Sequence, residues 1–170
     1  MVQIIVALAG LQDPPWAESF FPDDIPAQWR LDYYANEFEA LVVRPGERVM
    51  DGLDSMVEDL EDLEDLEDVL TLWVPREPSG APDVSVSWIV PYDVDSVWTG
   101  PDSAPGGAVA VLNADEPWSR RDLRGAIELW MQGRGRSASE EAGDVVLAFA
   151  GEAAVQTARD ARVLAGLLGY

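Results

Sequence analysis

The chain contains no cysteine, no histidine and no lysine among its 170 residues. Without these side chains it cannot by itself build a disulfide, a zinc–thiolate site, a cysteine nucleophile, an imidazole base or a lysine Schiff base. Positive charge is also scarce, because 11 arginines face 32 carboxylates and leave a formal net charge of −21. Hydrophobic residues make up 48% of the chain, which is enough for the core of one domain spanning residues 1–170.

The excess of carboxylates bears on possible partners. A surface so negative repels DNA, RNA and anionic lipid, since phosphate binding depends on clustered cations. We therefore expect no nucleic-acid partner and no membrane partner. Two explanations of the acidity stay open: adaptation to high salt, where screening relieves self-repulsion, or GC-rich codons that favour arginine over lysine in an ordinary acidic protein.

The first ten residues are apolar but short, and no positive residue precedes them. This pattern predicts a buried strand rather than a signal peptide or a membrane span. No other stretch approaches the roughly 20 apolar residues that a spanning helix needs. We expect a soluble, cytoplasmic protein.

Short apolar runs alternate with amphipathic stretches along the chain, which predicts an α/β fold with a parallel sheet covered on both faces. The least regular part is the middle, residues 75–106, which is rich in proline and glycine. Strands are predicted at residues 1–10, 40–43, 70–74, 84–90, 107–112 and 144–149. Helices are predicted after Pro26 with apolar positions through Phe38, at about 52–68, from a Ser119–Asp122 capping box until Gly133 stops the helix, and at about 152–168.

Two charged segments have alternative interpretations. Residues 58–68 hold eight carboxylates in eleven positions, which is typical of a surface for cations or a basic partner, or of the solvated face of an amphipathic helix. The second interpretation is favoured, because the run lacks the glycine turn of a calcium loop. Residues 120–136 hold five of the 11 arginines. They could bind phosphate, stabilise a helix end, or dock on the acidic helix of a second copy.

The N-terminal segment resembles the opening of the YecE-like family, domain of unknown function 72. The residues that carry the resemblance are Gly10, Trp16, Phe20-Phe21-Pro22, Trp29, Tyr33-Tyr34-Ala35 and Phe38. Residues 119–131 and 144–169 are similar to the last strand–helix pairs of that family, whose members fold as β/α barrels. A complete barrel takes about 250 residues. The resemblance therefore implies a TIM-barrel-like parallel fold shortened to about six strands, with an open doubly wound sheet as the alternative.

The departures from the family concern polar residues at strand ends. The family's Thr-Ser after the first strand is replaced by Leu8-Ala9, and Asn113-Ala114-Asp115 stands where an Arg-x-His-Gly is expected. An Asn pair after the last strand has become Ala150-Gly151. These replacements imply that the scaffold persists while the family's polar site has been lost.

Residues at the carboxyl ends of the strands are the functional candidates, because parallel α/β folds place their sites there. The favoured hypothesis is a non-catalytic binding or interaction domain without a cofactor, which binds a protein partner or a small molecule; self-association is one way to cover its incomplete barrel. The alternative is a hydrolase of a phosphorylated small molecule, in which Asp13, Asp115 and Glu152 hold Mg²⁺ or Mn²⁺ that generates hydroxide. Candidate ligand-binding residues are Gln12, Trp16, Arg44, Arg76, Tyr92 and Asn113, with Arg44 or Arg76 as the phosphate clamp.

Overall fold

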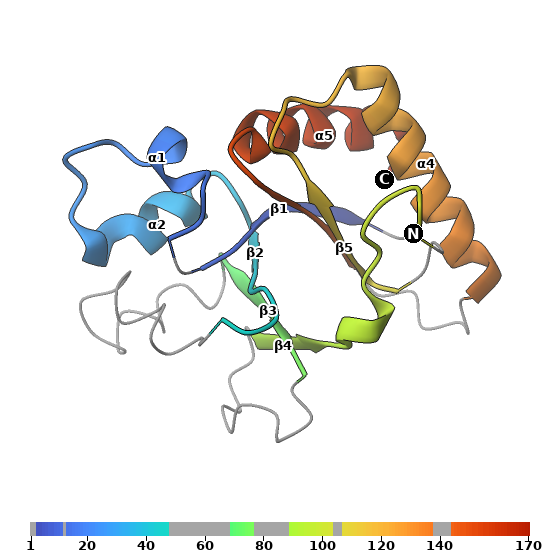
Figure 1. Ribbon diagram of the computed structural model, residues 1–170, viewed down its shortest axis with the longest axis horizontal. Helices are drawn as coiled ribbons and strands as arrows, with labels where there is room; N and C mark the ends of the chain where they lie inside the picture. The colour runs from blue at the N-terminus through green and yellow to red at the C-terminus, as the bar shows by residue number, and fades with distance from the viewer. Residues whose placement is uncertain (1–2, 12, 48–68, 77–88, 104–106, 138–143) are drawn as a thin grey trace.

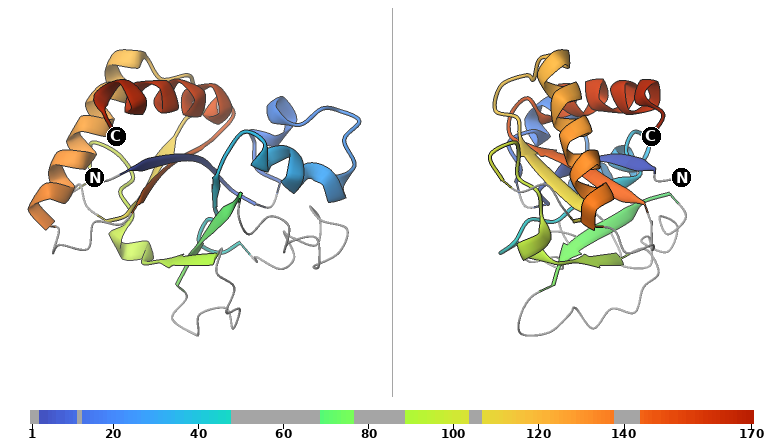
Figure 2. Two further views of the ribbon diagram at one scale, coloured as in Figure 1. Left: turned by 180° about the vertical axis from the view of Figure 1, so that it is seen from behind. Right: turned by 90° about the vertical axis from the view of Figure 1, so that its right-hand side faces the viewer.

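The computed structural model describes residues 3–11, 13–47, 69–76, 89–103, 107–137 and 144–170. Six parallel strands form one curled sheet, with helices on its outer side (Figures 1 and 2). The strands are β1 Ile4–Ala9, β2 Ala40–Val42, β3 Thr71–Pro75, β4 Ile89–Tyr92, β5 Val109–Asn113 and β6 Val145–Ala150. The helices are α1 Ala17–Phe20, α2 Arg30–Ala35, α4 Arg120–Ser137 and α5 Ala154–Leu168, with 3-10 turns η1 Ala27–Trp29 and η3 Val94–Ser96.

The strand order is β4-β3-β2-β1-β6-β5. The steps from β1 through β4 and from β5 to β6 all go to the neighbouring strand in the same direction, and only the step from β4 to β5 passes from one edge of the sheet to the other. The first and last strands pair over five residues, from Ile4 with Val145 to Leu8 with Phe149, as they do where a barrel closes. A doubly wound sheet reverses direction halfway. The predicted shortened α/β barrel is thus confirmed as a half-barrel, and the order is not that of the doubly wound alternative.

Among the described residues the sheet does not close into a ring, and its two edge strands, β4 and β5, are both blunted. Pro91 removes a backbone donor from β4, which discourages further strand pairing. The outer side of β5 pairs with the single residue Trp98, whose N–H donates to the Val109 carbonyl at 3.0 Å and whose carbonyl accepts from Val111 at 2.9 Å. Neither edge therefore offers a long, bare backbone for strand addition.

Both faces of the sheet are buried, in two separate clusters. Side chains of β1 alternate, so that Leu8 packs toward the helices while Ala7 and Ala9 point into the curl. The inner cluster combines small residues with two large ones, which lets the sheet curl tightly around a filled interior. Its buried members are Ala7, Ala9, Ala40, Val42, Trp73, Tyr92, Val109, Val146 and Ala148.

Five of the aromatic residues that carry the resemblance pack together in the outer cluster, namely Trp16, Phe20, Phe21, Tyr34 and Phe38, whereas Trp29 and Tyr33 are exposed. The Trp16 ring lies 5.9 Å from each of the rings of Phe20, Phe21 and Tyr34. The Tyr34 hydroxyl accepts from the Leu8 N–H at 3.0 Å and donates to the Ala40 carbonyl at 2.7 Å. Complete burial raises the pKa of Tyr34 far above its usual value. The hydroxyl thus stays neutral and links β1 to β2.

Some predicted element boundaries differ from the observed ones. The predicted helix start at Ser119–Asp122 is confirmed, since the Asp122 N–H donates to Ser119 Oγ at 3.2 Å, while the Asp122 carboxylate accepts from the Ser119 hydroxyl at 2.7 Å. The predicted stop at Gly133 is wrong, because α4 continues to Ser137; a helix tolerates an interior glycine at a cost of about 1 kcal/mol. The predicted helix at 52–68 and residues 84–88 of a predicted strand lie outside the described residues. No described helix is long and apolar enough to cross a bilayer.

Candidate functional site at the carboxyl ends of the strands

The carboxyl ends of all six strands meet at one end of the curled sheet, where a barrel enzyme carries its active site. The polar residues that follow the strands lie there. Most of them are held by hydrogen bonds within the protein, and these bonds decide what the site can do.

Glu47 is the most enclosed carboxylate at this end, with 9% of its side chain exposed. Its oxygens accept from the Leu11 N–H at 3.0 and 3.2 Å and from the Arg44 N–H at 2.7 Å. The Arg44 guanidinium lies 3.5 Å from the same carboxylate. Glu47 therefore ties the turn after β1 to the turn after β2. Sequence reasoning missed it; the available signal was an acid three residues after Arg44 in an Arg-Pro-Gly turn, placed to fold back on backbone N–H groups.

Arg44, a predicted phosphate clamp, lies against the backbone at the end of β1. Gly10 has a φ of +112°, and a Cβ there would lie 3.0 Å from Pro14 Cβ and 3.5 Å from Arg44 Nε. The glycine thus makes room for the guanidinium to cover the chain. Arg44 Nε is buried without a hydrogen-bond acceptor. The predicted clamp is therefore engaged with Glu47 and the Gly10 turn rather than standing free in the site.

Tyr92, a predicted ligand-binding residue, is buried, with 4% of its surface exposed. Its hydroxyl donates to the Val43 carbonyl at 2.6 Å and so joins the end of β4 to the end of β2. Burial, followed by the nearby Glu47 charge, raises the pKa of Tyr92 to about 12. The phenol therefore remains neutral at pH 7, and its proton is already donated in the hydrogen bond to the Val43 carbonyl.

Asn113 and Asp115 bind each other after β5. Asn113 Nδ2 donates to Asp115 Oδ2 at 2.8 Å, and the indole of Trp118 donates to the Asn113 carbonyl at 2.9 Å. Asp115 lies over Gly151, whose φ is +111°: a Cβ at that position would approach Asp115 Oδ1 to 2.6 Å. The close approach of the turns after β5 and β6 thus depends on a glycine there.

The remaining candidates are dispersed around this end. Asp13 and Glu152 line one hollow of about 990 Å³ together with Arg30. Trp16 is buried, and its indole donates to the Ala9 carbonyl at 2.9 Å, so it serves the core. Arg76 is exposed. Gln12 lies outside the described residues.

The three predicted metal ligands do not assemble. Asp13, Asp115 and Glu152 are all described, yet the part of the chain that the structure describes holds no group of three or more carboxylates that could hold a metal ion. Asp115 is hydrogen-bonded to Asn113, whereas Asp13 and Glu152 line a hollow that Asp115 does not line. The arrangement offers no preformed set of hard oxygen ligands at these positions.

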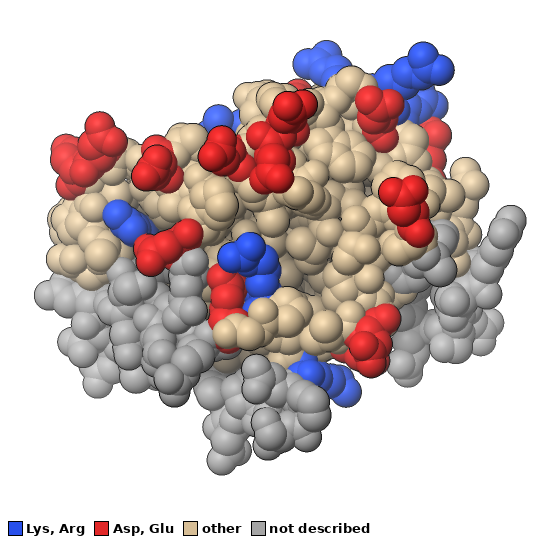
Figure 3. Space-filling view, in the orientation of Figure 1, with Lys and Arg blue, Asp and Glu red and all other residues tan. Residues whose placement is uncertain are grey.

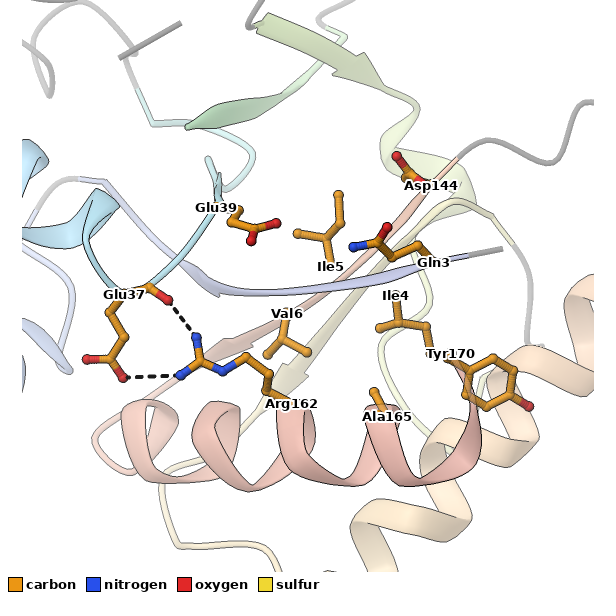
Figure 4. Close-up of a pocket in the computed structure, with 11 residues that line it drawn as sticks. Gln3, Ile4, Ile5, Val6, Glu37, Glu39, Asp144, Arg162, Ala165 and Tyr170 are labelled. Carbon is orange, nitrogen blue, oxygen red and sulfur yellow. Dashed lines mark hydrogen bonds and ion pairs between the residues drawn. The ribbon is translucent and has the colours of Figure 1, made fainter. Parts of the chain in front are cut away.

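A second hollow of about 460 Å³ lies at the opposite, amino end of the strands (Figure 4). Arg159 makes a bidentate ion pair with the Glu37 carboxylate, in which Nε and Nη2 donate at 2.6 and 2.9 Å. Arg162 donates to the Glu37 backbone carbonyl at 2.6 Å. The bond from Arg159 lowers the pKa of Glu37. These contacts clamp α5 to the segment before β2. They lie at the end of a barrel that serves stability rather than catalysis.

No family model matches the chain, and comparisons with curated proteins and with solved structures likewise give no match. Its own residues and their contacts are therefore the ground for any functional inference.

Proposed function

We propose that this chain is a non-catalytic interaction domain, built on a shortened YecE-like barrel from which the family's polar site has been lost. One observation carries the proposal: the most buried carboxylate and the buried phenol described at the carboxyl ends of the strands are used to hold the fold. Glu47 bonds the backbone after β1 and β2, and Tyr92 bonds the backbone after β2. A site that binds substrate needs polar groups aimed at the ligand. Here the two most buried groups point at the protein's own chain.

The composition supports a particular setting for this domain. Eleven arginines, no lysine and a net charge of −21 suit a salt-rich cytoplasm, where screening relieves repulsion between carboxylates. We include this setting in the proposal, and it fixes the conditions of the test.

A thermal-shift experiment tests the proposal against a metal-dependent phosphate hydrolase. The protein is melted in about 1–2 M salt, where charge repulsion is screened, with Mg²⁺, Mn²⁺, inorganic phosphate and phosphorylated metabolites added singly. A specific ligand at a hundred times its Kd would stabilise the fold by about 2.7 kcal/mol. We expect no saturable shift with any of them.

The variants Asp13→Asn and Asp115→Asn make this experiment decisive, with Glu116→Gln as an exposed neighbouring control. A saturable shift that disappears in either Asp variant and survives in the control would overturn the proposal and locate an active site. The absence of a ligand-induced shift in the wild type and in all three variants supports it.

A further inference from the structure

The segment between β1 and β2 presents an exposed aromatic face, formed by Trp29 and Tyr33. Trp29 has 58% of its surface exposed, and Tyr33, four residues further on, is 40% exposed. This spacing places both side chains on one side of the turns η1 and α2. The Tyr33 ring lies 5.5 Å from the buried Phe20 ring, at 77° to it. The aromatic face is therefore supported by the core, while a large part of it remains open to a partner.

Carboxylates are the dominant charged groups of the same segment. Residues 13–36 contain five of them, all exposed: Asp13, Glu18, Asp23, Asp24 and Asp32. None of the five makes an ion pair with another described residue. In Figure 3, acidic side chains gather at the end of the molecule that carries α1 and α2. Their negative charge is therefore available to a partner.

Arg30 follows Trp29 directly and is the one arginine of residues 13–36. Its guanidinium carbon lies 5.4 Å from the centre of the Phe21 ring, and its Nε is buried. Arg30 is therefore turned onto an aromatic ring of the core. Even counted in full, its charge offsets one of the five carboxylates and leaves four negative charges uncompensated in this segment.

A hollow of about 990 Å³ adjoins the aromatic face. The charged residues that line it are four carboxylates and one arginine: Asp13, Glu18, Asp23, Glu152 and Arg30. Phe21 forms part of its wall, and the Phe21 ring lies 6.0 Å from the ring of Tyr33. Hollow and aromatic face are thus neighbouring parts of one surface, with an excess of negative charge in both.

The carboxylates of this surface are dispersed rather than convergent. The described parts of the chain hold no group of three or more that could coordinate one metal ion. Dispersed carboxylates beside exposed aromatic rings match several separate cationic side chains. Arginine suits both features, because its guanidinium bonds carboxylates with two parallel N–H groups and also stacks on aromatic rings.

The charge of the whole chain narrows the choice of partner. A second copy carries the same net charge of −21, so two copies repel each other. Nucleic acids and anionic lipids are repelled for the same reason. The occupant that complements this surface is therefore a different protein, one with a basic segment.

We infer that the aromatic face and the adjoining hollow form a docking surface for an arginine-rich segment of a basic partner protein. One arginine of that segment enters the hollow beside Glu18 and Asp23, and another stacks on Trp29. The inference rests on the proposed interaction function and names the chemistry of the partner. At high salt the close contacts carry the binding, because the Debye length falls to about 3 Å at 1 M.

Fluorescence anisotropy of a labelled oligoarginine peptide, titrated with the full chain, tests the inference. At about 0.1 M salt the peptide should bind saturably, and at about 1 M salt more weakly. An oligolysine peptide of the same length should bind more weakly than oligoarginine, because an ammonium group stacks less well on an aromatic ring. An oligoglutamine peptide should not bind.

Variants show whether binding occurs at this surface. Trp29→Ala and the double variant Glu18→Gln with Asp23→Asn should each weaken oligoarginine binding about threefold or more. All three positions are exposed, so the variants should fold, as circular dichroism will check.

Matched controls change the same properties elsewhere. The double variant Glu39→Gln with Asp144→Asn removes the same two charges from exposed positions that directly precede β2 and β6, at the opposite ends of the strands. Leu167→Ala removes an exposed apolar side chain from α5. Both controls should bind oligoarginine like the wild type, since charges beyond a Debye length of about 10 Å are largely screened at 0.1 M salt.

Three results would overturn the inference. The first is the absence of saturable oligoarginine binding at the lower salt concentration. The second is an equal loss of affinity in the two double variants, which would mean that the peptide responds to overall charge. The third is unchanged affinity in Trp29→Ala. None of them touches the proposed function, which fails only if the thermal-shift experiment reveals a metal or phosphate site at Asp13 or Asp115.

Discussion

Replacing Glu47 with alanine is expected to lower the free energy of unfolding by about 2–4 kcal/mol. The side chain accepts hydrogen bonds from two backbone N–H groups, at 2.7 to 3.2 Å, and faces the Arg44 guanidinium. Bonds to a charged acceptor contribute about 1.5–3 kcal/mol each, and enclosed donors left unpaired add a further cost. Denaturant unfolding at constant high salt measures the change directly.

Glu152→Ala is the matched control for this prediction. It removes the same side chain from the same end of the sheet, but Glu152 is exposed. Its stability should lie within about 0.5 kcal/mol of the wild type. If Glu47→Ala proves as stable as Glu152→Ala, Glu47 does not hold the strand ends together, and the role assigned to it is wrong.

Replacing Trp130 with alanine is expected to cost about 3–5 kcal/mol, the range for removing a buried tryptophan. Trp130 is fully buried on the inner side of α4 and stacks on Trp98, with ring centroids 6.2 Å apart and planes 4° from parallel. Trp98 in turn bridges the outer side of β5. The substitution should therefore loosen α4 and the edge of the sheet together.

Trp29→Ala provides the comparison. It removes the same side chain from a position that is 58% exposed, so the free energy of unfolding should hardly change. Equal losses for Trp29→Ala and Trp130→Ala would contradict the packing of α4 against the sheet. The Val111 N–H donates to the Trp98 carbonyl, so its rate of hydrogen exchange reports on the β5 edge of the sheet in the same samples.

The strands were the most predictable part of the fold, because a parallel sheet buried on both faces demands uninterrupted apolar runs. The runs that became β1, β5 and β6 show this plainly. Their spatial order was not readable from periodicity, since β1 pairs with β6 across more than 130 residues. The predicted helix end at Gly133 was wrong although glycine ends many helices. Packing of the rest of α4 outweighs the modest cost of one glycine inside the helix.

The candidate site was predictable in position but not in role. The expectation that Arg44, Tyr92 and Asp115 follow the strands was correct. Tyr92 and Trp16 were assigned to ligand binding because their polar atoms suit it, yet both donate to backbone carbonyls of the protein itself. A sequence does not state which carbonyl a tyrosine reaches, since Tyr92 and Val43 are 49 residues apart. The use of such groups by the fold appears only in three dimensions.

A ¹H–¹⁵N correlation experiment on assigned protein tests the central claim most directly, by following the amides at the carboxyl ends of the strands in one series of spectra. Adding Mg²⁺ or phosphate should leave the amides of Leu11, Arg44 and Asp115 unmoved, because the groups there hold the fold. Saturable, localised shifts at those three amides would contradict the proposed non-catalytic domain and place a ligand at the strand ends.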